Sequence, residues 1–257
     1  MKKYLAFARV SILGQLKQLK DQFGTVLSFC IHILILSFLW DFVLAGKELA
    51  GYTKQELVWY VIIAEAIMYS FHYYYKKIAA KVEMGDFAYD MTKPFNYLIR
   101  IIVEGIAELP LTAALLVVGY VLGILFVGAL SIKLWQVLIC LVVMLLSTIL
   151  LLLLNIIVGL LSIWLGRDIS SVWLLVSKAM LIFAFSPIEL LPKTVQNILL
   201  FLPTTHVIYT PASLLVKFST EKLLISCVYI LASFVILAVI LCVIYKKGVK
   251  RQNVNGI

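Results

Sequence analysis

Charged residues are scarce in this chain. Asp, Glu, Lys and Arg make up 14% of its 257 residues, against about 25% in an ordinary soluble domain. Hydrophobic residues make up 63%, and the mean hydropathy is +1.07. A soluble globule of this size cannot bury so much apolar surface. The composition therefore excludes a soluble enzyme, a secreted domain and a disordered chain, and it requires a lipid bilayer around the protein.

Residues that carry catalysis or hold metals are also few. The chain has 3 His and 4 Cys, and no two Cys stand at a metal-ligand or redox spacing. The sequence has no H-E-x-x-H motif, no G-x-S-x-G motif and no phosphate-binding G-x-x-x-x-G-K-[ST] loop. We therefore expect a non-catalytic chain without a metal or cofactor of its own. Any ATP-driven work then requires another polypeptide.

Basic residues outnumber acidic ones, and the net charge is +9. In a soluble protein this excess would suggest a nucleic-acid partner, but the chain has no basic patch interleaved with aromatic residues. In a membrane protein the same excess is typical of basic cytoplasmic loops and of contact with anionic lipid. We expect the lipid bilayer, and no nucleic acid, as a partner.

Six apolar stretches are long enough to be transmembrane helices. They cover residues 23–44, 57–75, 101–127, 134–165, 172–191 and 223–245. Barrel strands would alternate in polarity and be about 10 residues long, so the stretches predict helices. The fourth would be about 48 Å long as one helix, so we expect it to tilt or protrude. The sequence thus predicts an all-α membrane protein with a single transmembrane domain over residues 1–257.

Lys and Arg predict the orientation. They concentrate before residue 21, in the 76–100 loop, at Arg167 and after the sixth span, and they are fewer in the loops of the other face. Because cytoplasmic loops carry the excess of Lys and Arg, we expect both termini in the cytoplasm.

The N-terminal segment 2–20 has an amphipathic pattern. Apolar residues recur at helical spacing on one face, and Lys and Arg lie on or beside the other face; the apolar positions are Leu5, Ala8, Ile12, Leu16 and Leu19. This predicts a helix in the membrane interface. The alternative is a helix that packs on the protein itself.

The loop between the second and third spans is polar and longer than a bare connection requires, which is typical of a functional loop. Strong helix formers run to Met84, and Gly85 can end that helix in a left-handed conformation. Asp86 can cap a second short helix, and Pro94 ends it. We expect a compact helix–turn–helix on the cytoplasmic face.

The stretch 187–222 before the last span contains four of the six prolines but stays apolar. It is too broken for one spanning helix. We expect residues 192–222 to form short helices on the outer face that dip partway into the bilayer, where irregular backbone must be buried in protein or line a wet cavity.

Among the polar residues within the predicted spans, five are functional candidates, because ionisable groups are costly in hydrocarbon. They are His32, Glu65, Glu104, Glu108 and Lys178. Glu104 and Glu108 share a helix face and could meet the basic loop or a partner's cations. Glu65 could pair with Lys178, and His32 could be a buried contact or a proton site. For each, structural pairing and a direct role in transport both stay open.

With this organisation, the chain resembles the type 2 ATP-binding-cassette (ABC) exporter permeases, and among them a bacterial branch of uncharacterised transport-system permeases. The resemblance extends over essentially the whole chain. Three features carry it: the amphipathic 2–20 helix, the Pro-rich stretch before the last span, and the loop sequence Glu83-Met84-Gly85-Asp86 followed by Tyr89-Asp90-Met91-Thr92-Lys93-Pro94.

The resemblance implies that 76–97 contains a coupling helix that docks on a separate ATPase, which binds ATP and Mg²⁺. The residues at the docking positions are Lys81, Glu83, Gly85, Asp86, Tyr89, Asp90, Lys93 and Pro94. It further implies two permeases, identical or similar, in the bacterial cytoplasmic membrane. The substrate would be amphiphilic or hydrophobic: a lipid, a peptide or a drug-like molecule.

Two other functions remain open from the residues alone. An ion-coupled secondary transporter would use Glu65, Lys178 and His32 at depth, and an inverted repeat of three spans would fit the contrast between the two large loops. A membrane scaffold that transports nothing is the third possibility.

Overall fold

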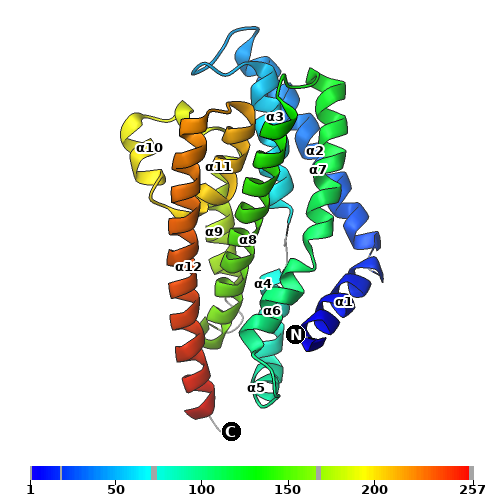
Figure 1. The fold of residues 1–257 in the computed structure, drawn as a ribbon, viewed down its shortest axis with the longest axis vertical. Coiled ribbons are helices and arrows are strands. Elements are labelled where there is room, and N and C mark those ends of the chain that lie inside the picture. The colour runs from blue at the N-terminus through cyan, green and yellow to red at the C-terminus, as the bar shows by residue number, and fades with distance from the viewer. Residues whose placement is uncertain (1, 18, 71–73, 166–168, 255–257) are drawn as a thin grey trace.

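The protein is all-helical in the computed structural model, which describes residues 2–17, 19–70, 74–165 and 169–254 (Figure 1). Side chains are described for residues 4–14, 23–70, 74–165 and 169–251. No strand forms within these ranges. The helices are α1 (Lys2–Lys17), α2 (Leu19–Leu44), α3 (Lys54–Met68), α4 (Tyr74–Glu83), α5 (Asp86–Met91), α6 (Tyr97–Ile106), α7 (Leu109–Val127), α8 (Leu134–Leu165), α9 (Ile169–Phe185), α10 (Lys193–Leu199), α11 (Pro203–Val216) and α12 (Thr220–Val254), with a 3-10 turn, η2 (Ile188–Leu190).

Four helical stretches in the described part of the chain are long and apolar enough to cross a membrane. They are Phe23–Leu44, Tyr97–Val127, Leu134–Leu165 and Thr220–Arg251, and the pair α10 and α11, bent by 111°, makes a fifth if it counts as one broken span. Each of the four single-helix stretches contains one predicted span: 23–44, 101–127, 134–165 and 223–245. The count of six spans stays a prediction.

Two predicted spans correspond to shorter helices. The span 57–75 corresponds to α3, which ends at Met68; residues 71–73 lie outside the described residues, and α4 begins at Tyr74. The span 172–191 corresponds to α9, which ends at Phe185 because the residue before Pro187 is disfavoured in a helix.

The predicted span 101–127 begins four residues earlier and is divided in two. The side chain of Asn96 accepts a hydrogen bond from the backbone N–H of Ile99 (3.2 Å) and so caps α6. The helix is interrupted at residues 107–108, just before Pro110, which cannot donate a backbone hydrogen bond to the preceding turn. The result is α6 followed by α7.

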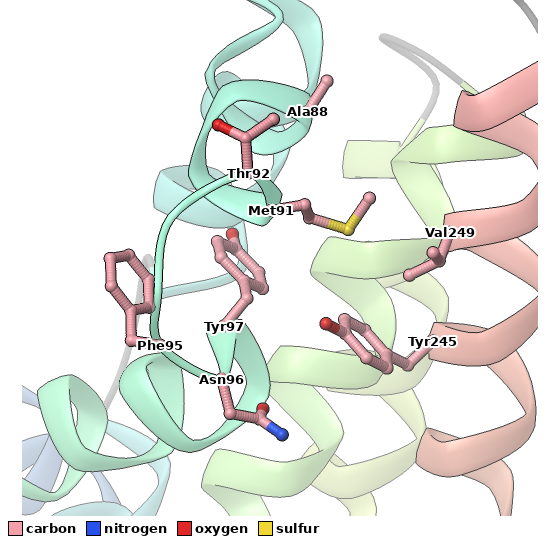
Figure 2. A pocket seen from close by; sticks show the side chains of 8 residues that line it. All are labelled: Ala88, Met91, Thr92, Phe95, Asn96, Tyr97, Tyr245 and Val249. Carbon is pink, nitrogen blue, oxygen red and sulfur yellow. The ribbon is translucent and has the colours of Figure 1, made fainter. Parts of the chain in front are cut away.

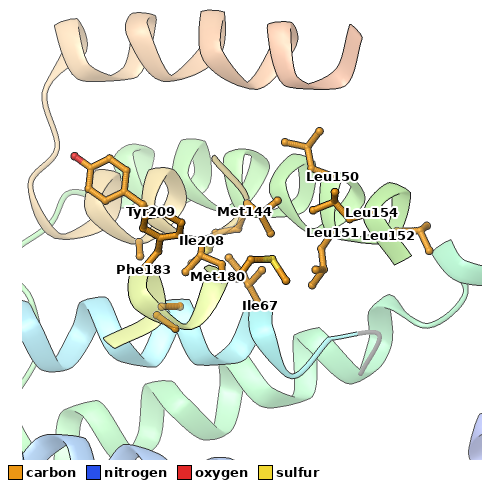
Figure 3. Packing of buried hydrophobic residues seen from close by; sticks show 14 of the residues in the cluster. Ile67, Met144, Leu150, Leu151, Leu152, Leu154, Met180, Phe183, Ile208 and Tyr209 are labelled. Carbon is orange, nitrogen blue, oxygen red and sulfur yellow. The ribbon is translucent and has the colours of Figure 1, made fainter. Parts of the chain in front are cut away.

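Helix α8 is the axis of the bundle. It is one uninterrupted helix over 134–165, with the predicted bounds, and its residues from Leu150 to Leu160 are all buried. Figure 3 shows how side chains of α3, α9 and α11 pack against it, including Ile67, Phe183 and Ile208.

The Pro-rich stretch forms α10 and α11, the short helices that the sequence predicted, but α11 belongs to the core. All its residues from Thr205 to Leu215 are buried, and it packs against α3, α8, α9 and α12. Helix α10 has no buried residue.

The bundle has two distinct ends (Figure 1). One end carries α1, α5 and the last turns of α12, and we call it the α5 end. The opposite end carries α10, the 45–53 loop and the start of α12, and we call it the α10 end. Arg167 lies outside the described residues.

Candidate functional site

The candidate site is the segment from Tyr74 to Arg100 at the α5 end, called here the α4–α5 segment. Gly85 ends α4 in a left-handed conformation, with φ at +79°, as the sequence predicted. The predicted cap of the second short helix is wrong: Gly85 is the N-cap of α5, Asp86 is its first residue, and no side-chain cap forms. The backbone turn at Gly85 therefore sets the start of α5.

Helix α4 is fixed tightly against α8. At Gly159 of α8, an added Cβ would lie 2.7 Å from Cβ of Ile78 and 3.0 Å from the backbone oxygen of Tyr75. The backbone N–H of Tyr75 donates to Oδ1 of Asn155 (3.3 Å), and the hydroxyl of Tyr74 donates to the carbonyl of Ile101 in α6. At this contact α4 and the central helix therefore lie too close together for any residue larger than glycine at position 159.

Helix α5 is held from inside by one aromatic ring and one carboxylate. Phe87 is fully buried and packs edge-on against Tyr97, with ring centroids 4.9 Å apart. Asp90 is also buried. It accepts hydrogen bonds from Nζ of Lys93 (2.7 Å) and from Nη1 of Arg100 (2.9 Å). The predicted docking residue Asp90 thus serves the internal structure of the segment.

Glu104 and Glu108 meet basic residues of this segment, one of the two options that the sequence left open. Nε of Arg100 donates to Glu104 (2.6 Å), and Nζ of Lys81 lies 3.7 Å from the same carboxylate. Lys77 pairs with Glu108. Together with the pair between Asp90 and Arg100, these contacts link α4, α5 and α6 into one charge network.

The electrostatics of Asp90 follow from this network. Burial alone would raise the pKa of its carboxyl. The hydrogen bond from Lys93 and the positive charge of Arg100 outweigh that effect, and the pKa of Asp90 lies below its ordinary value. The carboxylate is therefore charged at neutral pH.

Helix α1 is clamped onto the α4–α5 segment. The ring of Phe7 packs edge-on against Phe95 at 5.3 Å, and the Arg100 guanidinium lies over both rings, 4.7 Å and 5.2 Å from their centroids. The hydroxyl of Tyr4 accepts a hydrogen bond from the backbone N–H of Asn96 (3.1 Å). The hydrogen bond from Ser11 to the carbonyl of Glu104 (3.1 Å) adds a contact to α6.

The predicted apolar face of α1 is only partly covered: Ala8 and Ile12 line a cavity with residues of α6 and α7. Leu5 and Ile12 are exposed, whereas the side chains of residues 15–22 lie outside the described ones. The helix therefore offers an exposed apolar surface, as an interfacial helix would, and also packs on the protein.

The tip of the segment is exposed and carries two bulky side chains, Met84 at 76% and Tyr89 at 65% of their full exposure. Five of the eight predicted docking residues are exposed as well: Glu83, Gly85, Asp86, Tyr89 and Pro94. Lys81 is half-buried, and Lys93 is half-buried with its ammonium 4.2 Å above the ring of Tyr89. A partner that meets this tip would contact Met84 and Tyr89 first.

A cavity of about 400 Å³ lies between the α4–α5 segment and the last turns of α12 (Figure 2). We call it the socket. Its lining residues are Ala88, Met91, Thr92, Phe95, Asn96, Tyr97, Tyr245 and Val249. Tyr97 is 1% exposed, and its hydroxyl has no hydrogen-bond partner in the described part of the chain.

The polar residues predicted within the spans lie apart from this segment. Glu65 is 2% exposed, and its Oε2 lies 3.6 Å from Nδ1 of His32. The same nitrogen is hydrogen-bonded to the hydroxyl of Tyr69 (2.9 Å). The other oxygen of Glu65 has no partner among the described atoms.

The possible pair between Glu65 and Lys178 does not form. Lys178 is exposed on α9, and His32 from α2 takes the place beside the carboxylate. No group of three or more His, Cys, Asp or Glu that could hold a metal occurs within the described ranges.

The comparison with known families gives one finding. The sequence model described as ABC-2 family transporter protein matches residues 26–256. The match begins inside α2 and includes the whole α4–α5 segment and α12. A search of curated proteins gives no match.

Proposed function

The chain belongs to the ABC-2 family of transporter proteins, and from this premise we propose that it is the permease subunit of an ATP-driven exporter. As a member of that family it is a multi-pass membrane subunit of a transporter. In the proposal, a separate ATP-binding-cassette ATPase binds ATP and Mg²⁺ and docks on the α4–α5 segment.

The tip of the α4–α5 segment is the observation that carries this proposal. It exposes Met84 and Tyr89 to a partner, while its inner side is fixed to α8 through Gly159 and Asn155. In the proposal, a displacement of the tip by the ATPase reaches α8 through this contact. A permease without an ATP site of its own needs such a connection, because ATP hydrolysis in the partner must move its helices.

The distribution of charge supports a cytoplasmic position for the α5 end. Basic residues of α4, α6 and α12 gather there, and we expect them on the cytoplasmic side of a bacterial cell membrane. Both termini are then cytoplasmic, and the α10 end faces outward.

An apolar cavity supports a hydrophobic or amphiphilic substrate such as a lipid, a peptide or a drug-like molecule. It has a volume of about 250 Å³ between α3, α7 and α8, and no charged side chain lines it. Trp59, Tyr120 and Met144 are among its walls. Such a lining receives an apolar group without desolvating a charge.

The exposed face of α9 supports a second permease, identical or similar. Lys178 lies on this apolar helix about 13 Å from its first residue. A charge at such a depth costs about 3 kcal/mol in contact with lipid, and a second subunit that faces α9 removes that cost.

Co-purification tests the proposal. We expect the tagged chain, extracted from native membranes in nanodiscs, to bring down a stoichiometric P-loop ATPase identified by mass spectrometry. Met84→Asp combined with Tyr89→Asp should reduce its recovery at least tenfold, because exposed aromatic and Met anchors dominate protein interfaces. Leu49→Asp, at an exposed position of the 45–53 loop of the α10 end, is the matched control.

If the wild-type chain is recovered alone under several mild conditions, the ATP-driven function is wrong. Equal recovery of the ATPase by the double variant and the wild type would instead move the docking site away from the tip.

Glu65→Gln is expected to impair transport without lowering the stability of the protein. The substitution removes a carboxylate that is buried within the membrane bundle and has an unpartnered oxygen. The unfolding temperature should therefore stay equal or rise, while substrate-stimulated ATP hydrolysis falls about tenfold, as expected for a functional intramembrane carboxylate. A drop in unfolding temperature with normal stimulation would assign Glu65 a purely structural pairing with His32.

A further inference from the structure

A cavity of about 460 Å³ lies between α1 and the place where α6 ends and α7 begins. We call it the α1 groove; Ala8 and Ile12 line one side, and Ile106, Pro110 and Ala113 are among the residues of the other side. We propose that it binds an anionic phospholipid of the surrounding bilayer, with one acyl chain in the groove and the phosphate near α1. The inference requires a bilayer around the protein and does not depend on the ATPase.

The first argument is the chemistry of the walls. Every side chain that lines the α1 groove is apolar. Water finds no hydrogen-bond partners among these side chains, whereas a hydrocarbon chain gains dispersion contacts along both walls. It also gains them without desolvating a polar group. The groove is therefore suited to a hydrocarbon chain.

The second argument is the position of the groove in the membrane. Helix α7 has 19 residues and is about 28 Å long, close to the thickness of a hydrocarbon core, which is about 30 Å. The groove includes Pro110 and Ala113 in the first turns of α7, and so it lies at the edge of the hydrocarbon. Beyond it, Val117 and Val121 continue the exposed side of α7 at helical spacing. An acyl chain in the groove can therefore extend along α7 toward the middle of the bilayer.

The third argument is the charge of α1. All charged residues of this helix are basic, namely Lys2, Lys3, Arg9 and Lys17. Arg9 is exposed, and its position one residue after Ala8 and three before Ile12 places it within about one helical turn of the groove. It has no ion-pair partner among the described side chains. An unneutralised cation thus lies beside the groove at the level of the lipid headgroups, where it favours an anionic lipid.

The acids of the neighbouring elements leave this preference in place. Glu104 and Glu108 are both paired with basic residues of α4 and α6. The exposed acids Glu83 and Asp86 belong to α4 and α5, and neither helix contributes a residue to the groove.

The protein itself holds the groove open. Helix α1 lies beside α6 (Figure 1), and it is fixed there by the contacts of Tyr4, Phe7 and Ser11 described above. These three residues form one helix face, and Ala8 and Ile12 lie on the strip next to it. A lipid chain in the groove therefore adds a contact between α1 and α7 at the flank of the existing ones.

A lipid titration followed by native mass spectrometry tests this inference. The probes are phosphatidylglycerol and phosphatidylcholine with the same acyl chains, added to the full-length chain in detergent. We expect the wild type to retain one phosphatidylglycerol about fivefold more tightly than phosphatidylcholine, the effect of one basic residue near the phosphate. Arg9→Gln should remove that difference. Ala113→Trp fills the groove and should weaken the binding of both lipids about tenfold, because methylene groups of the chain lose their contacts.

Two control variants match these substitutions. Ala114→Trp introduces the same side chain at the neighbouring exposed position of α7, outside the groove, and should bind both lipids as the wild type does. Arg251→Gln removes an exposed cation of α12 and should keep the preference for phosphatidylglycerol.

Three results would overturn the inference. Equal binding of the two lipids by the wild type would refute the anionic lipid. Equal binding of phosphatidylglycerol by Ala113→Trp and the wild type would refute the groove as its site, and so would an equal loss in Ala113→Trp and Ala114→Trp. None of these results changes the recovery of the P-loop ATPase in the co-purification, so this inference and the proposed function fail separately.

Discussion

Replacing Arg100 with alanine is expected to destabilise the protein by about 3 kcal/mol, the usual result when one partner of a buried ion pair is removed. The guanidinium pairs with Asp90 and Glu104 and lies over the rings of Phe7 and Phe95. Its side chain is only 16% exposed, so water cannot replace these contacts. The variant leaves a buried carboxylate without its arginine and releases α1 from the α4–α5 segment.

Thermal unfolding in detergent measures the loss, and limited proteolysis within residues 86–96 reports the release of the segment. Arg100→Lys should lose nearly as much, because lysine cannot donate to two carboxylates in the same forked geometry. Lys246→Ala, which removes an exposed cation of α12, should change neither readout. An unfolding temperature for Arg100→Ala equal to that of the wild type would show that the charge network is not structural.

The stability that the ion pair between Asp90 and Arg100 contributes should fall at low pH. Because the pKa of Asp90 is lower in the folded protein than its ordinary value, the ion pair contributes fully at neutral pH. Its contribution is lost as the pH falls through the folded-state pKa. The difference in free energy of unfolding between the wild type and Arg100→Ala should therefore decrease in strong acid.

Replacing Gly159 with leucine should uncouple ATP hydrolysis from transport. The new side chain has no room beside Ile78 and the backbone of Tyr75, and α4 must move away from α8. Overpacking of this kind costs about 1–3 kcal/mol, and here the strain falls on the contact that transmits the motion of the docking tip. We expect substrate flux to drop at least tenfold while the chain still binds the ATPase.

Flux in reconstituted vesicles and recovery of the ATPase are the two measurements. Gly24→Leu in α2 is the matched control, because no atom lies within 4 Å of a Cβ added there, and it should behave as the wild type. Normal flux by Gly159→Leu would mean that the contact between α4 and α8 does not carry the motion.

The long apolar stretches were the predictable part of the fold. The uncharged stretch from Leu134 to Leu165 is one helix, as its hydropathy indicated. Hydropathy did not place the end of α3 at Met68, because the predicted span was continued over the aromatic residues that follow it, which are five of the seven residues at 69–75. It also could not reveal that α11 is buried, since burial depends on which helices surround a short segment.

In the candidate site, the sequence predicted the turn at Gly85 but not the contacts that hold the α4–α5 segment in place. Gly85 was a clear signal, because a left-handed residue after helix formers is a common helix end. The clamp of Arg100 between Phe7 and Phe95 joins positions more than 80 residues apart, and no local spacing reports such a contact. The exposed docking residues and the buried Asp90 look alike in the sequence, because both are polar residues of one short loop.

The short buried helix α11 constrains how the protein is made. It is 14 residues long and contains Pro211, His206 and several hydroxyl side chains, so it is too short and too polar to enter a bilayer by its own hydrophobicity. It can only be seated after α8 has entered the membrane and provided the surface on which it packs. Until α8 is in place, the buried side chains of α11 have no surface on which to pack.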